Sequence, residues 1–326
     1  PRFVVVSAAP TGSTTHPLSD LKPATFEAAA RPVVLDATTG KVLYTIPLPK
    51  GYWSSFSLVA GAPDNRTFVL AGQIAKPRQL GPPPAMVTDP PIRYFRVHLD
   101  EQGRPGDPVV LPGKANDQFG TANAIALSPD GTRLASVSDI AEGRRVTVVD
   151  LATGRQRVWT EHITTGLATD VSWAPDGRHL AVVLWEPGGH TGVRILDLTG
   201  PGTDLGAASL VPGMDERTKV VSAAYSPDGA SLIAIGTRAN GPGQPVEPVQ
   251  LQVLQIPLAG GTPRTLAKLP VSDLGRSNLS LDGTGHYVLY SHGRNINRVD
   301  LTTGRAQSFV IPMRQGKAGD EPGVAW

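Results

Sequence analysis

The chain has 326 residues, of which 40% are hydrophobic and 18% charged, and its formal net charge is +2. This composition supplies enough apolar material for a large core and lacks the charge excess of a disordered chain. Without a run of Lys and Arg interleaved with aromatic residues, the sequence lacks the charge pattern of a nucleic-acid binder, so we expect no nucleic-acid partner. The absence of Cys excludes disulfides, thiol catalysis and Cys-ligated zinc.

The chain opens on an apolar strand, 3–7, directly after Pro1-Arg2 and without an initiator Met. We therefore expect that a segment upstream of Pro1 has been removed. No run in the sequence approaches the ~18 apolar residues that a membrane-spanning helix needs.

One turn recurs between short apolar runs. Ser-Pro-Asp-Gly begins at Ser128 and Ser226, and Ala-Pro-Asp-Gly begins at Ala174. Looser copies begin at Ala62 (Ala-Pro-Asp-Asn) and Asp282 (Asp-Gly-Thr-Gly), which makes five. Pro fixes its own φ and Gly or Asn tolerates positive φ, so each copy predicts a hairpin.

A second turn alternates with the first in six copies, at 36–41, 100–103, 150–155, 197–200, 257–261 and 300–305. Two hairpins per unit predict four strands per unit. The spacing is 46 residues from Pro129 to Pro175 and 52 from Pro175 to Pro227, which suits one propeller blade per repeat. The spacing of 66 from Pro63 to Pro129 reflects a Pro-rich insertion.

Small residues occupy the third position before the proline, or its replacement Gly283, of each first-type turn: Ala60, Ala126, Ser172, Ala224 and Ser280. We attribute their size to crowding of the innermost strands near the axis. The next residue is mostly bulky, as at Trp173 and Tyr225, and we expect these side chains in the core between blades.

The C-terminus ends in Ala325-Trp326, which repeats the small-then-bulky pair and then stops. Its missing partner is 3–7, which aligns with 180–184. We therefore predict that both termini build the first blade, a closure that leaves no open strand edge in the ring.

The predicted fold is all-β: a six-bladed β-propeller of four-stranded antiparallel blades, with the first blade closed by the C-terminal strand. It forms a single domain over 1–326. The predicted blades are 1–50 plus 322–326, then 51–113, 114–161, 162–213, 214–270 and 271–321.

The two turn types lie on one face of such a ring, and long, unlike loops lie on the other. Function concentrates on variable loops held by a rigid scaffold. The candidate ligand-binding residues are Tyr52, Trp53, Gln118, Phe119, His162, Asp170, Trp185, Arg217, Arg276 and Asn278, with His190 on the same face. Asp170 and Asn278 both lie five residues before the turn proline or its replacement, and such polar groups could orient a ligand. The alternative is a set of solvated loops around a water-filled channel.

The sequence contains no nucleophile elbow, His-Glu-x-x-His helix, phosphate-binding loop or EF-hand pattern. Its seven histidines never occur at close metal-ligand spacing, so a metal would need ligands from several blades. We therefore assign no catalytic residue, metal ligand or cofactor.

The pattern Ser-Pro-Asp-Gly-x-x-Leu-Ala from Ser128, followed by Val-Val-Asp-Leu-Ala-Thr-Gly-Arg from Val148, resembles TolB-like and WD-repeat-like propellers of bacteria. That repeat implies the fold but serves scaffolds, sensors and peptidase propellers alike. The segment 92–105, with the opening strand, is similar to actinobacterial membrane proteins. That resemblance implies an extracytoplasmic propeller, anchored to the cell membrane through the removed N-terminal segment.

The leading hypothesis is a non-enzymatic, extracytoplasmic binding or sensing module for a protein, peptide or cell-envelope glycan ligand. The alternative is a propeller enzyme with a channel metal, lactonase-like or lyase-like; a purely structural spacer is a third possibility. Because a propeller satisfies its own edges, we expect a monomer.

Overall fold

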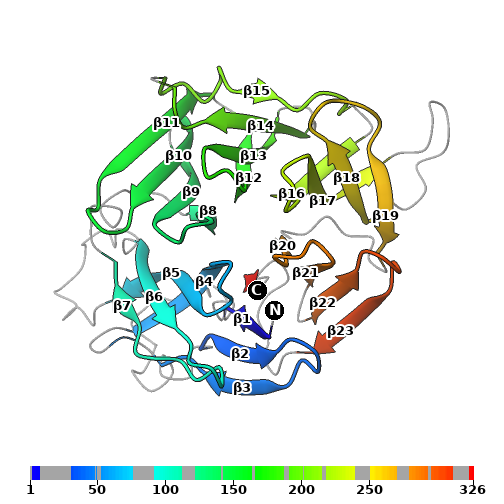
Figure 1. Cartoon of the computed structure of the whole chain (residues 1–326). Coiled ribbons are helices and arrows are strands. Elements are labelled where there is room, and N and C mark those ends of the chain that lie inside the picture. The colour runs from blue at the N-terminus through cyan, green and yellow to red at the C-terminus, as the bar shows by residue number, and fades with distance from the viewer. Residues whose placement is uncertain are drawn as a thin grey trace, which may run out of the picture.

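The computed structural model describes residues 2–7, 31–47, 49, 53–75, 92–111, 122–140, 142–163, 166–186, 191–200, 202–214, 218–238, 250–269, 279–292, 295–310 and 323–326. All the regular structure in these ranges is β-strand. Figure 1 shows six blades in a ring, and each blade is a four-stranded antiparallel sheet. The six-bladed propeller predicted from the alternating turns is confirmed.

Each blade runs from an innermost strand, named first, to an outermost strand, named last. Blade 1 consists of β24 (Val324–Ala325), β1 (Phe3–Val6), β2 (Val33–Asp36) and β3 (Val42–Thr45). Blade 2 consists of β4 (Trp53–Gly61), β5 (Thr67–Ala75), β6 (Ile92–His98) and β7 (Val109–Val110). Blade 3 consists of β8 (Ala122–Leu127), β9 (Arg133–Ile140), β10 (Gly143–Asp150) and β11 (Gln156–His162).

The remaining three blades follow in chain order around the ring. Blade 4 consists of β12 (Leu167–Trp173), β13 (His179–Trp185), β14 (Thr191–Asp197) and β15 (Ser209–Leu210). Blade 5 consists of β16 (Thr218–Tyr225), β17 (Ser231–Arg238), β18 (Gln252–Pro257) and β19 (Arg264–Lys268). Blade 6 consists of β20 (Leu279–Leu281), β21 (Tyr287–His292), β22 (Asn295–Asp300) and β23 (Ala306–Val310).

The first-type turns have the backbone that their sequence predicts. Gly131 and Gly229 adopt φ of 68° and 69°, and Asn65, the residue in the same place of blade 2, has φ of 54°. The turn aspartate caps the turn: in blade 3 the Ser128 hydroxyl donates to Asp130 Oδ1 at 2.5 Å. Because these signals are local, the hairpins could be predicted before the fold was known.

The ring closes through the two ends of the chain, which lie side by side near its centre (Figure 1). β24 pairs antiparallel with β1, with Val5 opposite Ala325 and Val6 opposite Val324. The Ser7 amide extends this ladder by donating to the Gly323 carbonyl at 2.9 Å. The predicted closure of the first blade by the C-terminal strand is confirmed.

Six apolar clusters form the core, one at each junction between neighbouring blades. Alternate residues of one strand face opposite neighbours, because side chains alternate across a strand. In β1, Phe3 and Val5 pack toward blade 2, whereas Val4 and Val6 pack toward blade 6. A strand buried on both faces reads as a continuous apolar run, which explains the Phe-Val-Val-Val sequence.

The alternation of strand direction gives the ring two different faces. The turns between first and second strands and between third and fourth strands lie on what we call the hairpin-turn face. The connections between second and third strands, and from blade to blade, lie on the opposite face, which we call the loop face. This distinction matters because residues of the hairpin-turn face line both of the cavities described below.

Candidate functional site

A cavity of about 610 Å³ lies in the central channel. Its wall is formed by the inner strands of the six blades. The small residues of the repeat all line it: Ala60, Ala126, Ser172, Ala224, Ser280 and Ala325. We attributed their size to crowding at the axis; in the structure the small side chains also leave the channel open.

The cavity extends to the hairpin-turn face. Four turn prolines and a glycine in the fifth turn form that end of its wall: Pro63, Pro129, Pro175, Pro227 and Gly283. From the sequence we expected a binding site on the loop face and did not select these residues. The signal was present in the sequence, because the same proline recurs at the same place in four of the repeats.

Asp170, in the inner strand of blade 4, is a carboxylate in the cavity wall. Its two oxygens are both engaged. The Val171 amide donates to Oδ1 at 2.8 Å, the Ala223 amide donates to Oδ2 at 3.0 Å, and the Ser222 hydroxyl also donates to Oδ2. Asp170 therefore ties the inner strands of blades 4 and 5 together.

The same network continues to the next blade. The Ser222 oxygen accepts a hydrogen bond from the Leu279 amide at 3.1 Å, so one carboxylate and one hydroxyl link β12, β16 and β20. Burial raises the pKa of Asp170 to about 6, although the three hydrogen bonds oppose that shift. A buried carboxyl with a raised pKa in a cavity is a feature of structural networks and of functional sites alike.

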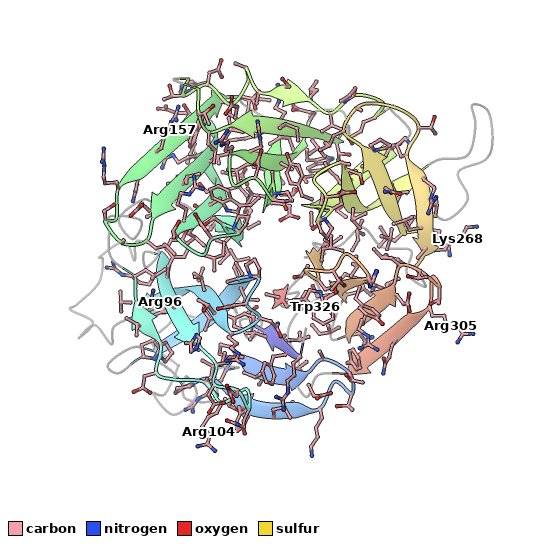
Figure 2. All side chains as sticks on the ribbon, viewed as in Figure 1. Arg96, Arg104, Arg157, Lys268, Arg305 and Trp326 are labelled. Carbon is pink, nitrogen blue, oxygen red and sulfur yellow. The ribbon has the colours of Figure 1, made fainter. Side chains whose placement is uncertain are left out.

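Aromatic residues join the inner strands near the hairpin-turn face. The Trp173 indole donates from Nε1 to the carbonyl of Ala126 in blade 3 at 3.0 Å. Trp326, which Figure 2 shows at the centre of the ring, makes the same bond to the Ser280 carbonyl of blade 6 at 3.0 Å. Both indoles are buried, so these residues belong to the inter-blade core as expected.

A buried ionic cluster lies toward the loop face, at the junction of blades 3 and 4. The Arg144 side chain is 0% exposed and donates to both oxygens of Glu186, at 3.0 and 2.9 Å. Glu161 lies 3.4 Å from Arg144 and 3.6 Å from Arg194. The strand pattern did not reveal this cluster, because its partners come from different blades.

The described structure places four of the ten candidate residues. Asp170 lines the channel cavity, and Trp185, at the end of β13, is 46% exposed. The exposed His162 lies 3.9 Å from Glu142 Oε2. Trp53 begins β4. These four residues come from three blades: Trp53 from blade 2, His162 from blade 3, and Asp170 and Trp185 from blade 4. Tyr52, Gln118, Phe119, Arg217, Arg276 and Asn278, together with His190, lie outside the described residues.

Within the ranges that the structure covers, no three His, Asp or Glu side chains gather closely enough to hold a metal ion. The described part of the chain also contains no helix with the length and apolar character needed to cross a bilayer.

No protein-family model and no curated protein matches the sequence. Solved structures do match: TolB from Acinetobacter baumannii has a TM-score of 0.60 at 13% identity, over 100% of this chain and 66% of that one. The putative TolB from Agrobacterium tumefaciens has a TM-score of 0.57 at 15% identity, over 99% and 97% of the two chains. The chain has the fold of the TolB-like propellers.

A propeller enzyme is also similar to this chain. The periplasmic gluconolactonase PpgL from Pseudomonas aeruginosa has a TM-score of 0.54 at 15% identity, over 99% of this chain and 98% of that one. The chain spans about two thirds of the Acinetobacter TolB. At identities this low the likeness shows the fold alone, and the matches include an enzyme as well as TolB.

Proposed function

We propose that this chain is a non-enzymatic, extracytoplasmic binding or sensing module for a protein, peptide or cell-envelope ligand, and that the ligand enters the central channel from the hairpin-turn face. The observation that carries the proposal is the channel cavity of about 610 Å³. That volume falls within the range of ligand sites, which are mostly apolar with a few oriented polar groups.

The chemistry of the wall supports binding rather than acid-base catalysis. Small apolar residues and prolines form most of the described wall. The Asp170 carboxylate accepts three hydrogen bonds from the protein itself and so is used in holding blades together. An extended peptide segment is a suitable occupant, since it is narrow and presents both apolar side chains and polar backbone groups.

The experiment is a selection of phage-displayed random dodecapeptides on the immobilised protein. Selected peptides are then titrated against wild type, Ala126→Trp, which fills the channel, and Ala152→Trp, a matched change in an exposed turn on the same face. We expect at least a tenfold loss of affinity in Ala126→Trp alone. Equal affinity for all three proteins would overturn the proposal.

The location outside the cytoplasm, the membrane anchor and the monomeric state are parts of the same proposal. The likeness to a periplasmic gluconolactonase supports the location, and the resemblance of 92–105 to anchored actinobacterial proteins supports the anchor. Protease added to intact cells of the source organism should cleave the protein in the membrane fraction. Protection until the cells are lysed would contradict the location.

A lactonase-like channel enzyme is the second candidate, favoured by the buried Asp170 with its raised pKa and by the likeness to PpgL. It predicts hydrolysis of D-glucono-1,5-lactone by the purified protein loaded with a divalent cation. It also predicts that Asp170→Asn abolishes that hydrolysis while the protein stays folded. Hydrolysis at the uncatalysed rate would remove this candidate for that substrate class.

A further inference from the structure

The junction of blades 3 and 4 is filled on the hairpin-turn face by an arginine of the chain itself. The Arg133 guanidinium lies over the Trp173 ring, 4.7 Å from its centroid. Its Nη2 donates to the Gly177 carbonyl in the turn of blade 4 at 2.8 Å, and it lies 4.0 Å from its own turn aspartate, Asp130. A cation, an aromatic face and a turn carbonyl therefore complete this junction.

The next junction, between blades 4 and 5, has a different set of residues at the same repeat positions. His179 replaces Arg133, Tyr225 replaces Trp173, and Gly229 replaces Gly177. The shorter His179 side chain pairs with its own turn aspartate, with Nδ1 2.7 Å from Asp176 Oδ2. At this junction the chain supplies no guanidinium from the equivalent position.

A cavity of about 480 Å³ lies at this junction, and both His179 and Tyr225 line it. We call it the blade 4/5 cleft. Its apolar wall includes Ile195, Leu210, Val211, Pro212 and Leu258. Leu210, in the two-residue outer strand β15, is 59% exposed. The wall could therefore bury an aliphatic stem.

A polar group in the wall of the blade 4/5 cleft is free to form a further hydrogen bond. Tyr225 is only 8% exposed, and its hydroxyl makes no hydrogen bond with any residue that the structure describes. A hydroxyl in a cavity wall without such a partner is available to a group from outside. Burial raises the pKa of Tyr225, and the neighbouring Asp176 carboxylate adds to that shift, so the hydroxyl stays neutral.

Two carboxylates in the cleft wall, Asp176 and Asp228, give it a negative charge. Hydrogen bonds from the Ser226 hydroxyl and the turn backbone lower the pKa of Asp228, so it is ionised at neutral pH. Both of those bonds end on Oδ1: Ser226 Oγ donates at 2.6 Å and the Ala230 amide at 3.0 Å. Oδ2 accepts neither of these two bonds and is available to a cation.

We propose that the blade 4/5 cleft binds the arginine side chain of a peptide ligand, in the place that Arg133 takes between blades 3 and 4. The guanidinium stacks on Tyr225 and pairs with Asp228, and its aliphatic stem packs against Leu210 and Val211. Arginine suits the site better than lysine, because a planar guanidinium can stack on a ring and still donate in its own plane.

This inference rests on the proposed binding function and names a second contact of the same ligand. The two cavities adjoin, since Pro175 and Tyr225 line both. A peptide bound at the channel mouth could therefore place one arginine side chain directly in the neighbouring blade 4/5 cleft.

The test uses the peptide acetyl-Ala-Leu-Arg-Leu-Ala-amide and the same peptide with citrulline, which keeps the shape of arginine but is neutral. The full chain is labelled with 3-fluorotyrosine, and Tyr225→Phe identifies the Tyr225 signal in the ¹⁹F spectrum. We expect the arginine peptide to shift that signal with a roughly millimolar dissociation constant, and the citrulline peptide to bind at least tenfold more weakly.

Two variants test the site itself. His179→Arg, which supplies the chain's own guanidinium, should weaken the arginine peptide at least tenfold, and Asp228→Asn should weaken it at least fivefold. Asp130→Asn is the matched control, because Asp130 caps the same turn in blade 3 and lies outside the cleft. It should bind as wild type does.

Several outcomes would overturn the inference: no binding of either peptide, equal binding of both, or unchanged binding by both variants. If His179→Arg fails to fold, the citrulline peptide and the Asp228→Asn variant still test the arginine site. Selected peptides whose affinity falls in Ala126→Trp but is unchanged in Asp228→Asn would support the proposed function and overturn only the arginine site. If the arginine peptide still binds to Ala126→Trp and no selected peptide depends on the channel, the arginine site stands and the proposed channel function is overturned.

Discussion

Asn65 and Phe3 hold each other by two hydrogen bonds across the junction of blades 1 and 2. The Phe3 amide donates to Asn65 Oδ1 at 2.9 Å, and Asn65 Nδ2 donates to the Phe3 carbonyl at 2.9 Å. The Arg2 amide adds a third bond to the same Oδ1 at 2.7 Å. Asn65 takes positive φ where the other described first-type turns have Gly, so one residue shapes its turn and fastens β1.

The first prediction separates these two roles of Asn65. Asn65→Gly keeps the turn but loses the side-chain bonds, and we expect the free energy of unfolding to fall by about 1–3 kcal/mol. Asn65→Ala should cost about 1 kcal/mol more, because it also disfavours positive φ. Urea denaturation measures both. Gly131→Asn is a control at φ of 68° with open space for a side chain, and it should change little. Equal stability of wild type and Asn65→Gly would show that the side-chain hydrogen bonds of Asn65 do not stabilise the fold.

The second prediction concerns Asp170 and pH. Its pKa is about 6 in the folded protein against an ordinary value of 3.8, because burial disfavours the charged form. The folded state therefore binds the extra proton between these two values. Its contribution to stability is present below the lower pKa and is lost as pH rises through the higher one.

Relative to Asp170→Asn, wild type should therefore lose on the order of 3 kcal/mol of unfolding free energy between pH 4 and pH 7.5. Urea denaturation at several pH values measures this difference. Asp150→Asn provides a control of opposite sign at lower pH: the hydroxyl and amide of Thr153 lower the pKa of Asp150, so wild type should lose stability relative to that variant as pH falls below 3.8. Parallel pH profiles for wild type and Asp170→Asn would show that the carboxyl is not shifted.

The third prediction concerns the buried Arg144. Glu186→Gln removes the charge of its bidentate partner and should lower the free energy of unfolding by about 1–3 kcal/mol, because a buried guanidinium loses compensation. Glu142→Gln, at a carboxylate whose side chain is 78% exposed, is the control and should be neutral. Thermal and urea unfolding of both variants compare them. A neutral Glu186→Gln would mean that Glu161 alone compensates Arg144.

The fourth prediction concerns the closure of the ring at Trp326, which is 6% exposed. Trp326→Ala should cost about 3–5 kcal/mol, from lost burial and the cavity it leaves. Trp326→Phe keeps most of the packing and loses the bond to the Ser280 carbonyl, so it should cost about 1–2 kcal/mol. Trp173→Phe removes the equivalent bond to Ala126 and should match it. A much larger loss at Trp326 would show that closure limits the stability of the ring.

The fold could be predicted from the sequence to the level of blades and closing strand, whereas the channel end that we propose as the ligand entrance could not. The Pro-Asp-Gly turns repeat along the chain, and Ala325-Trp326 repeats the end of an inner strand. Of the ten candidate residues, Asp170 is described in the channel wall. The channel end with the turn prolines was missed, because a proline was read only as a turn former.

The sequence by itself determined the blade number, the hairpins and the pairing of the two termini. These depend on φ preferences and on the period of apolar residues, which the local chain carries. The tertiary structure alone decided that Ser222 engages Asp170, 52 residues away, and that Glu186 pairs with Arg144, 42 residues away. It also decided that a cleft lies beside His179, where the preceding junction holds Arg133. Such contacts exist only once neighbouring blades are set side by side, because each partner comes from a different blade.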